Sequence, residues 1–171
     1  MSKRITPIVV FVVWLLALGG PGQAWAQACF WTDSFSEENP PSICPAGHAV
    51  KGIRCDGRNC DRKRLQCCRY MSGFDRTASY RWSQWVSEER PGREVSRDEF
   101  VSGLACQGRY CDNLRIRYVR SERLQNSERC RRTAAFSSGA EEVCKAGEFV
   151  AGLECRGSYC AELRLYCCAE R

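Results

Sequence analysis

The stretch AVKGIRCDGRNCDRKRLQCC, residues 49–68, occurs three times in this chain with variations. Its counterparts are FVSGLACQGRYCDNLRIRYV at residues 100–119 and FVAGLECRGSYCAELRLYCC at residues 149–168. The first cysteines of the three stretches align, at Cys55, Cys106 and Cys155. Their spacing of about fifty residues is the length of one small supersecondary unit. The sequence therefore predicts three repeats, spanning residues 29–69, 80–119 and 130–169.

Residues 1–26 are predicted to be a cleaved signal peptide. Lys3 and Arg4 provide a positive start, residues 8–18 form an unbroken apolar run of eleven, and small residues precede position 27. The run is too short to span a bilayer as a helix. Because no second apolar segment follows, we expect no transmembrane segment.

A lipobox is the alternative interpretation of the same boundary. It would place an acyl chain on Cys29, but the usual Leu is missing and Cys29 has a counterpart in Cys130. We therefore expect Cys29 to form a disulfide.

The mature chain, residues 27–171, is predicted to be one domain that is secreted, periplasmic or held at the cell surface. Removing the leader takes away two basic residues and no acid, so the net charge falls from +6 to +4. Basic and acidic residues are interspersed along the chain, so this excess argues against a nucleic-acid partner.

All 14 cysteines lie in the mature chain, which is typical of an exported disulfide framework. The second repeat keeps only Cys106 and Cys111, and has other residues at the four remaining positions, namely Tyr80, Val95, Tyr118 and Val119. Since cysteines should be lost as whole disulfides, the retained pair is predicted to bond to itself. The repeat extends this pairing to Cys55 with Cys60 and Cys155 with Cys160. Each loop contains a glycine suited to a tight turn, at Gly57, Gly108 and Gly157.

The remaining eight cysteines are predicted to pair within the first and third repeats. Neighbouring residues on a strand point to opposite faces, so one of Cys67 and Cys68 should bond Cys29 and the other Cys44. The same reasoning applies to the third repeat, at Cys130, Cys144, Cys167 and Cys168. Zinc is disfavoured, because zinc sites usually combine such a cysteine pair with a second Cys or His pair nearby, the chain has one histidine, and an oxidising compartment leaves few free thiolates.

Each repeat is expected to follow one plan of short strands. An aromatic segment opens it, and a polar loop follows at residues 36–42, 87–93 and 137–142. A short apolar strand then carries a glycine where a bulge or close backbone approach is expected, at Gly52, Gly103 and Gly152. After the cysteine loop, a last strand alternates apolar and polar residues, as at residues 114–118.

This plan predicts a disulfide-rich, all-β fold of antiparallel strands with three-fold closure. A β-prism satisfies it, and a β-trefoil is the alternative, since both avoid exposed sheet edges. Residues 70–78 and 118–132 are interpreted as linkers, the second with the option of a short helix.

The second repeat contains WSxW at residues 82–85, FVxGL at 100–104 and DNLRI at 112–116, and the third repeats FVxGL at 149–153 and LRL at 163–165. This succession resembles the outer-layer protein of the egg vitelline membrane. The resemblance implies three four-stranded sheets arranged as a prism, and the glycosyl transfer on chito-oligosaccharides attributed to that family. The CxGxYC loops differ from that family's longer acidic loop.

Binding of a glycan, with association to the envelope or matrix, is the leading functional hypothesis. Tyr110 and Tyr159 lie in the cysteine loops, where exposed rings can stack on sugars, and Asn59 takes their place in the first repeat. Polar side chains that give directional hydrogen bonds flank them, namely Arg58, Arg109, Asp112 and Asn113. The tryptophans of the opening segments, Trp31, Trp82 and Trp85, are expected to fill the core.

A purely structural extracellular module is the second hypothesis, and an enzyme is the third. Acidic pairs in the polar loops offer carboxylates for glycoside chemistry, at Glu37–Glu38, Glu88–Glu89 and Glu141–Glu142. The single histidine, His48, aligns with Glu99 and Glu148, so a solvated position is expected. We predict no cofactor, no metal and no catalytic residue.

Overall fold

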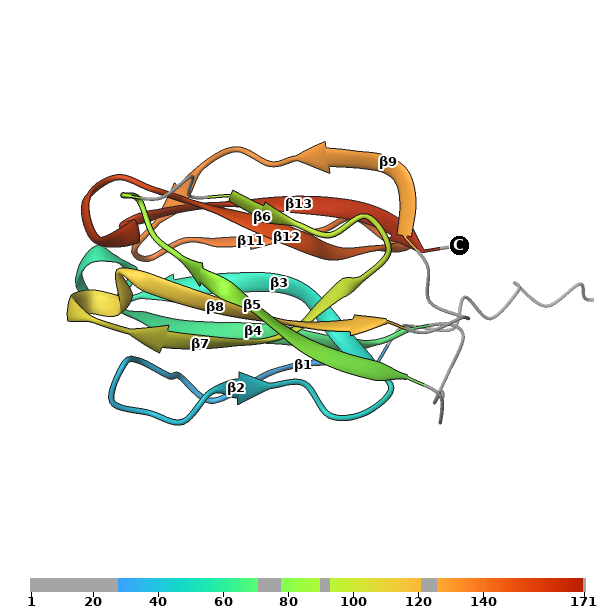
Figure 1. Ribbon diagram of the computed structural model, residues 1–171, viewed down its shortest axis with the longest axis horizontal. Coiled ribbons are helices and arrows are strands. Elements are labelled where there is room, and N and C mark those ends of the chain that lie inside the picture. Colours follow the sequence, from blue (N-terminus) through green and yellow to red (C-terminus); the bar gives the residue numbers. More distant parts are fainter. Residues whose placement is uncertain (1–27, 71–77, 90–92, 121–125, 171) are drawn as a thin grey trace, which may run out of the picture.

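The structure is a computed structural model that describes residues 28–70, 78–89, 93–120 and 126–170 (Figure 1). The predicted leader and most of the linker at residues 70–78 lie outside these residues. In the described part the regular structure is β-strand, apart from three single 3-10 turns, and all strand pairs are antiparallel. The prediction of an all-β fold is confirmed.

The strands form three sheets of equivalent order. Sheet A runs β1 (Cys29–Trp31), β4 (Arg62–Arg69), β3 (His48–Asp56) and β11 (Glu141–Val143). Sheet B runs β5 (Ser79–Val86), β8 (Asn113–Arg120), β7 (Phe100–Gln107) and β2 (Ser42–Ile43). Sheet C runs β10 (Phe136–Ser137), β13 (Glu162–Glu170), β12 (Glu148–Arg156) and β6 (Arg93–Val95), and β9 (Asn126–Arg132) also pairs with β13. Each sheet is centred on one predicted repeat.

The last strand of every sheet comes from another repeat. The first repeat gives β2 to sheet B, the second gives β6 to sheet C, and the third gives β11 to sheet A. Each exchanged strand has only two or three residues and falls at the end of a predicted polar loop. The exchange therefore links the three sheets in a closed cycle.

Glycines make room for the exchanged strands. The register shifts next to Gly52, Gly103 and Gly152, as expected for a bulge. A Cβ on Gly103 would lie 2.8 Å from the carbonyl oxygen of Ser42 on β2. One on Gly52 would lie 2.8 Å from the Val143 side chain on β11. The predicted bulge and the predicted close approach thus occur at the same residue.

The core lies between the sheets and follows the predicted alternation. Leu114, Ile116 and Tyr118 of β8 are fully buried, whereas Arg115 and Arg117 between them are half-buried. The equivalent strands β4 and β13 supply Leu65, Leu163 and Leu165 to the same cluster. A second, smaller cluster combines Ala49, Cys68, Tyr70, Phe100, Val119, Phe149, Ala151 and Cys168 from all three hairpins.

Seven disulfides account for all 14 cysteines. The short loops close as predicted, by Cys55–Cys60, Cys106–Cys111 and Cys155–Cys160. The structure also settles the pairing that the sequence left open, with Cys29–Cys68, Cys44–Cys67, Cys130–Cys168 and Cys144–Cys167.

One alignment from the sequence is wrong by a residue. In each sheet, one backbone amide donates a hydrogen bond to the carbonyl oxygen of the residue before the bulge glycine. The amide of Cys44 donates to Ser102 in sheet B, and that of Cys144 donates to Lys51 in sheet A. In sheet C the amide of Ser96 donates to Ala151. Ser96, rather than Val95, therefore occupies the place of Cys44 in the second repeat. A length difference in the polar loop hides this equivalence in the sequence.

Two further expectations are corrected. The segment at residues 118–132 is not a helix in its described parts, because its ends belong to β8 and β9. The tryptophans Trp31, Trp82 and Trp85 are half-buried and lie outside both core clusters, because they face away from the buried positions of β4 and β8. Among the described residues, no helix is long and apolar enough to cross a membrane.

Candidate functional site

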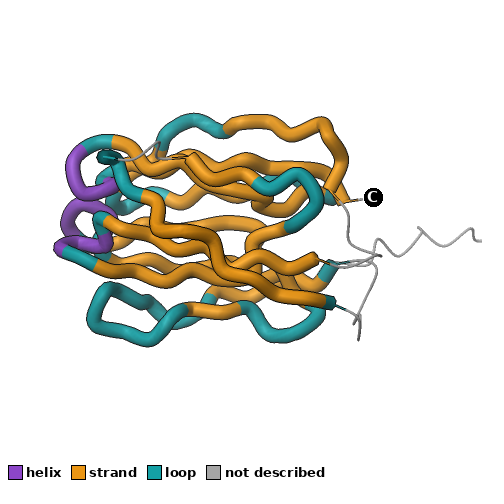
Figure 2. The backbone as a smooth tube through the Cα atoms, in the orientation of Figure 1, coloured by secondary structure: helices purple, strands orange, loops and turns teal. Residues whose placement is uncertain are grey.

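The three cysteine loops gather at one end of the molecule. Each contains a 3-10 turn, namely η1 (Arg58–Cys60), η2 (Arg109–Cys111) and η3 (Ser158–Cys160). Every turn contacts the other two, and Figure 2 shows them in purple, stacked at one end of the strands. Each turn joins the two central strands of one sheet, and the three turns lie at the same end of their sheets. The predicted ligand residues in these turns are therefore close together.

The backbone of these loops is left-handed where side chains rarely allow it. Gly57, Gly108 and Gly157 have positive φ, as predicted, but the pair of residues that ends each turn does as well. The first residue of each pair has a φ of 57° at Asn59, 60° at Tyr110 and 60° at Tyr159, and the cysteine that follows it also has positive φ. Asn tolerates this conformation, whereas Tyr adopts it at a cost of roughly 1–3 kcal/mol. Such strained residues cluster at functional sites.

Contacts between repeats hold the loops in place. The carboxylate of Glu37 accepts a hydrogen bond of 3.3 Å from the amide of Tyr110, and that of Glu88 accepts one of 2.8 Å from the amide of Tyr159. Ser138 stands at the equivalent place in the third repeat, and its hydroxyl donates to the carbonyl oxygen of Gly57. Each loop is thus fixed by the polar loop of another repeat: the second by the first, the third by the second, and the first by the third.

Sulfur contacts add to this arrangement. The Sγ atom of Cys111 lies 3.0 Å from the carbonyl oxygen of Asp61, and that of Cys160 lies 2.9 Å from the carbonyl oxygen of Asp112. The first loop therefore touches the second, and the second touches the third.

An aromatic pair forms the exposed part of the site. The rings of Tyr110 and Tyr159 lie edge to face with centroids 5.5 Å apart, and 37% of Tyr159 is exposed. The guanidinium of Arg109 lies 5.0 Å from the Tyr110 ring centroid and donates to its hydroxyl at 3.3 Å. This hydrogen bond raises the pKa of Arg109 above its usual value, so the group stays charged. Two rings and a cation from successive repeats thus share one surface.

The other predicted ligand residues play different parts. The amide of Asn113 donates to the Asp112 carboxylate at 2.7 Å, and both side chains fold over Gly108, so they stabilise the turn itself. Asn59 is half-buried in η1, and Arg58 beside it is exposed. Tyr110, Tyr159 and Arg109 are therefore the groups best placed for a ligand, with Arg58 beside them on η1.

A buried lysine lies beneath the loops. Lys63 is fully buried at a position where the other repeats have Leu114 and Leu163. Its Nζ donates to the carbonyl oxygen of Cys60 at 2.5 Å. Burial lowers the pKa of Lys63 to about 7, and the carboxylates of Asp61 and Glu37 oppose this only in part. The alternation along β4 is the sequence signal for this site, because it places Lys63 on the buried face, at the leucine position of the other repeats.

The acidic pairs do not form a repeated site. Glu37 and Glu88 bind loop amides, whereas Glu141 lies on strand β11 with its carboxylate 3.8 Å from Arg54. The expectation that Glu141–Glu142 belongs to a polar loop is therefore wrong, because these residues form the exchanged strand.

His48, for which a solvated position was expected, is half-buried, and its counterparts Glu99 and Glu148 are held in ion pairs. Glu99 is buried and accepts hydrogen bonds from Arg81 at 2.9 Å and from Ser96 at 2.8 Å. Arg131 pairs with Glu148 in the same way at 2.9 Å, and the ring of His48 packs against Phe30. Each group fixes the outer strand of its sheet.

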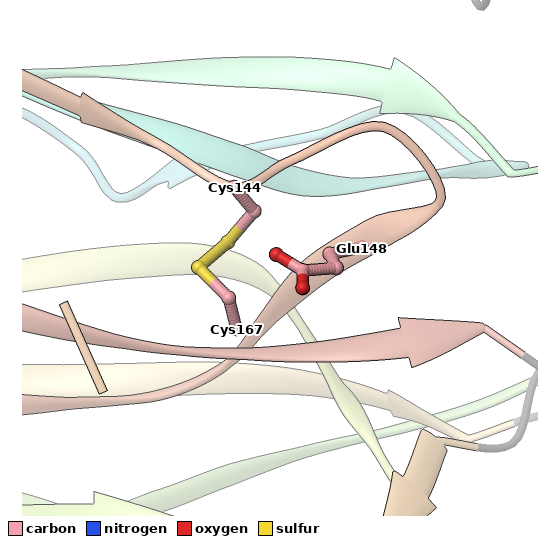
Figure 3. Close-up of side chains that lie close together, drawn as sticks. All are labelled: Cys144, Glu148 and Cys167. Carbon is pink, nitrogen blue, oxygen red and sulfur yellow. A yellow bond between two sulfur atoms is a disulfide. The ribbon is translucent and has the colours of Figure 1, made fainter. Parts of the chain in front are cut away.

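One group of side chains has the spacing of a metal site, but its chemistry does not fit. Cys144, Glu148 and Cys167 lie within 4.8 Å of one another (Figure 3). Figure 3 also shows that the two sulfur atoms are joined in a disulfide, with the Glu148 carboxylate beside it. A disulfide sulfur lacks the thiolate charge on which metal binding depends.

Comparisons with protein-family models, with curated proteins and with solved structures find no match.

Proposed function

We propose that this protein is an exported β-prism of three repeats that binds a glycan where its three cysteine loops meet. The observation that carries the proposal is the pair of rings of Tyr110 and Tyr159, with Arg109 stacked on one of them. Glycan sites combine aromatic faces that stack on sugar rings with a few polar groups that fix orientation.

The architecture supports this site. Three sheets of equivalent order, each completed by a strand from another repeat, agree with the closed prism implied by the resemblance to the vitelline outer-layer protein. Fixed backbones hold both tyrosines, because Glu37 and Glu88 bind their amides and disulfides close their loops. A preorganised site of this kind loses little entropy when a ligand binds.

Seven disulfides favour an oxidising location, outside the cell or in the periplasm. Export through the leader at residues 1–26 is part of the proposal. We expect no specific nucleic-acid partner, since the net charge of +6 over the whole chain is modest.

The test is a binding screen of the oxidised protein against chito-oligosaccharides and other glycans, repeated at high salt. We expect saturable binding that persists at high salt and falls at least about tenfold in Tyr110→Ala with Tyr159→Ala, because stacking is lost. The matched control is Phe30→Ala, which removes an exposed aromatic ring on strand β1 of sheet A, outside the cysteine loops. Equal loss in the control, or no binding to any glycan, would reject the proposal and leave a structural extracellular module.

A further inference from the structure

The outer face of sheet B carries a row of alternating aromatic and basic side chains. Tyr80, Trp82 and Trp85 come from β5, and Arg115 and Arg117 come from the neighbouring strand β8. The guanidinium of Arg117 lies 3.9 Å from the Tyr80 ring centroid. That of Arg115 lies 5.8 Å from Trp82 and 5.9 Å from Trp85. All five side chains are exposed or half-buried.

This face lacks the negative charge found on its counterparts. The four strands of sheet B contain no Asp or Glu, and in the part of the chain that the structure describes neither Arg115 nor Arg117 forms an ion pair. In sheet A, Arg64 stands in place of Arg115 and lies 3.6 Å from Asp56. In sheet C, Glu154 pairs with Arg132 at 3.7 Å and accepts a hydrogen bond from Tyr166. Among the described residues, Arg115 and Arg117 thus have no carboxylate partner on this face, whereas Arg81 of strand β5 pairs with Glu99.

We propose that this row, which we name the aromatic–arginine face (Tyr80, Trp82, Trp85, Arg115 and Arg117), binds an acidic polysaccharide. Sugar rings stack on the aromatic side chains, and carboxylates along the polymer pair with the two guanidinium groups. Both kinds of contact are needed, because rings alone would suit a neutral sugar and cations alone would attract any anion.

The charge of the face and the proposed compartment favour an acidic polysaccharide over a nucleic acid or a second copy of the chain. Unneutralised cations favour a polyanion. Export into an oxidising compartment, which is part of the proposed function, would place this face among extracellular polysaccharides. A second copy of the chain offers less, because the carboxylates on the outer faces of sheets A and C already pair with arginines of their own sheets. The face lies on the side of the sheet, away from the cysteine loops, so the inference does not depend on the loop site.

The experiment measures binding of oligogalacturonate, which carries one carboxylate per ring, by calorimetry on the oxidised protein. Its fully methyl-esterified form has the same rings without the charge. We expect saturable binding of the acid, binding at least about tenfold weaker for the ester, and a similar loss in Arg115→Gln with Arg117→Gln. The fold accepts glutamine here, because Gln66 stands in place of Arg117 in the first repeat.

Two control variants locate the effect. Arg64→Gln with Arg164→Gln removes the same number of charges at equivalent positions of the other sheets and should leave the affinity unchanged. Tyr110→Ala with Tyr159→Ala alters the loop site and should also bind oligogalacturonate normally.

Four outcomes would overturn the inference. These are absent binding of oligogalacturonate, equal loss in the Arg64 and Arg164 control, tighter binding of single-stranded DNA of equal charge, and a dimer in sedimentation that the Arg115 and Arg117 variant dissociates. The last two would assign the face to a nucleic acid or to a second copy of the chain.

Discussion

Sheets A and B have the same strand order but hold their strands together by different means. In sheet A, Cys29 and Cys68 face each other across β1 and β4 and form a disulfide. At the same paired position in sheet B, Tyr80 faces Val119. The fold is therefore defined by register, bulge glycines and the buried alternation of each hairpin, and the disulfide adds stability to an arrangement that forms without it.

A second disulfide makes the same point about the exchanged strands. Cys44 follows β2, which belongs to sheet B, and bonds Cys67 in sheet A, so it links two sheets covalently. In the second repeat Ser96 and Tyr118 stand at these positions, and β6 pairs with β12 in sheet C without a disulfide between the sheets. The second repeat thus lacks two of the disulfides that the other repeats have, and it is the repeat that carries the residues of the aromatic–arginine face.

The largest expected effect comes from removing a disulfide between sheets. Cys44→Ala with Cys67→Ala should lower the free energy of unfolding by roughly 3–4 kcal/mol, because the bond closes a long loop in the unfolded chain. Chemical denaturation measures this. Cys55→Ala with Cys60→Ala is the matched control, since those cysteines are equally buried but only 5 residues apart. It should lose about 2 kcal/mol. An equal loss in both variants would contradict the linking role.

Replacing the buried lysine should make the first repeat resemble the others. Lys63→Leu is expected to raise the free energy of unfolding at pH 7 by roughly 2–4 kcal/mol, because the unfolded chain no longer gains a proton that the folded protein disfavours. In the wild type the folded pKa of about 7 lies below the ordinary 10.5. The unfolded state therefore binds more protons between these values, and wild-type stability should rise with pH across that window.

Denaturation curves from pH 6 to pH 10 measure this dependence. The Lys63→Leu variant should lack the rise, and the neighbouring exposed Arg62→Gln variant should retain it. A rise of equal size in all three proteins would show that Lys63 is not its source.

The missing disulfide of sheet B can be restored. Tyr80→Cys with Val119→Cys places cysteines 39 residues apart at a paired register position, as in Cys29–Cys68. We expect the bond to form on oxidation and to add about 2 kcal/mol, measured as the difference between oxidised and reduced protein in denaturant. Failure of the bond to form, tested by thiol titration, would show that the two sheets are not equivalent here.

A smaller effect should follow from loosening one loop. Glu88→Gln weakens the acceptor for the Tyr159 amide and should cost about 1 kcal/mol. Hydrogen exchange at that amide is expected to accelerate, whereas Glu89→Gln should leave it unchanged. Unaltered exchange in both variants would contradict the role given to Glu88.

Much of this arrangement could be predicted from the sequence, because the three repeats can be aligned with one another and their differences interpreted. Retention of Cys106 and Cys111 predicts the short disulfides, and alternation along residues 114–118 predicts the buried face. The exchanged strands could not be predicted, because pieces as short as Ser42–Ile43 carry no periodic signal. The position of Ser96 and the hydrogen bond between Glu37 and Tyr110 could not be predicted either, because each depends on contacts between different repeats.

The orientation of the tryptophans on β5 could not be predicted from the sequence either. Aromatic residues in the opening segments were expected in the core. The sequence of β5 does not predict which side of the sheet its side chains face, because a register irregularity falls between Trp82 and Trp85. Only pairing with Arg115 and Arg117 places both rings on the outer surface.

We propose that the cysteine loops, and not the aromatic–arginine face of sheet B, bind chito-oligosaccharides or a related glycan. Amide chemical shifts of the oxidised protein, followed by NMR during titration with a chito-oligosaccharide, test this directly. We expect saturable changes at Tyr110, Tyr159 and Arg109 and none at Arg115 and Arg117. Changes confined to β5 and β8, or no changes at any amide, would contradict it.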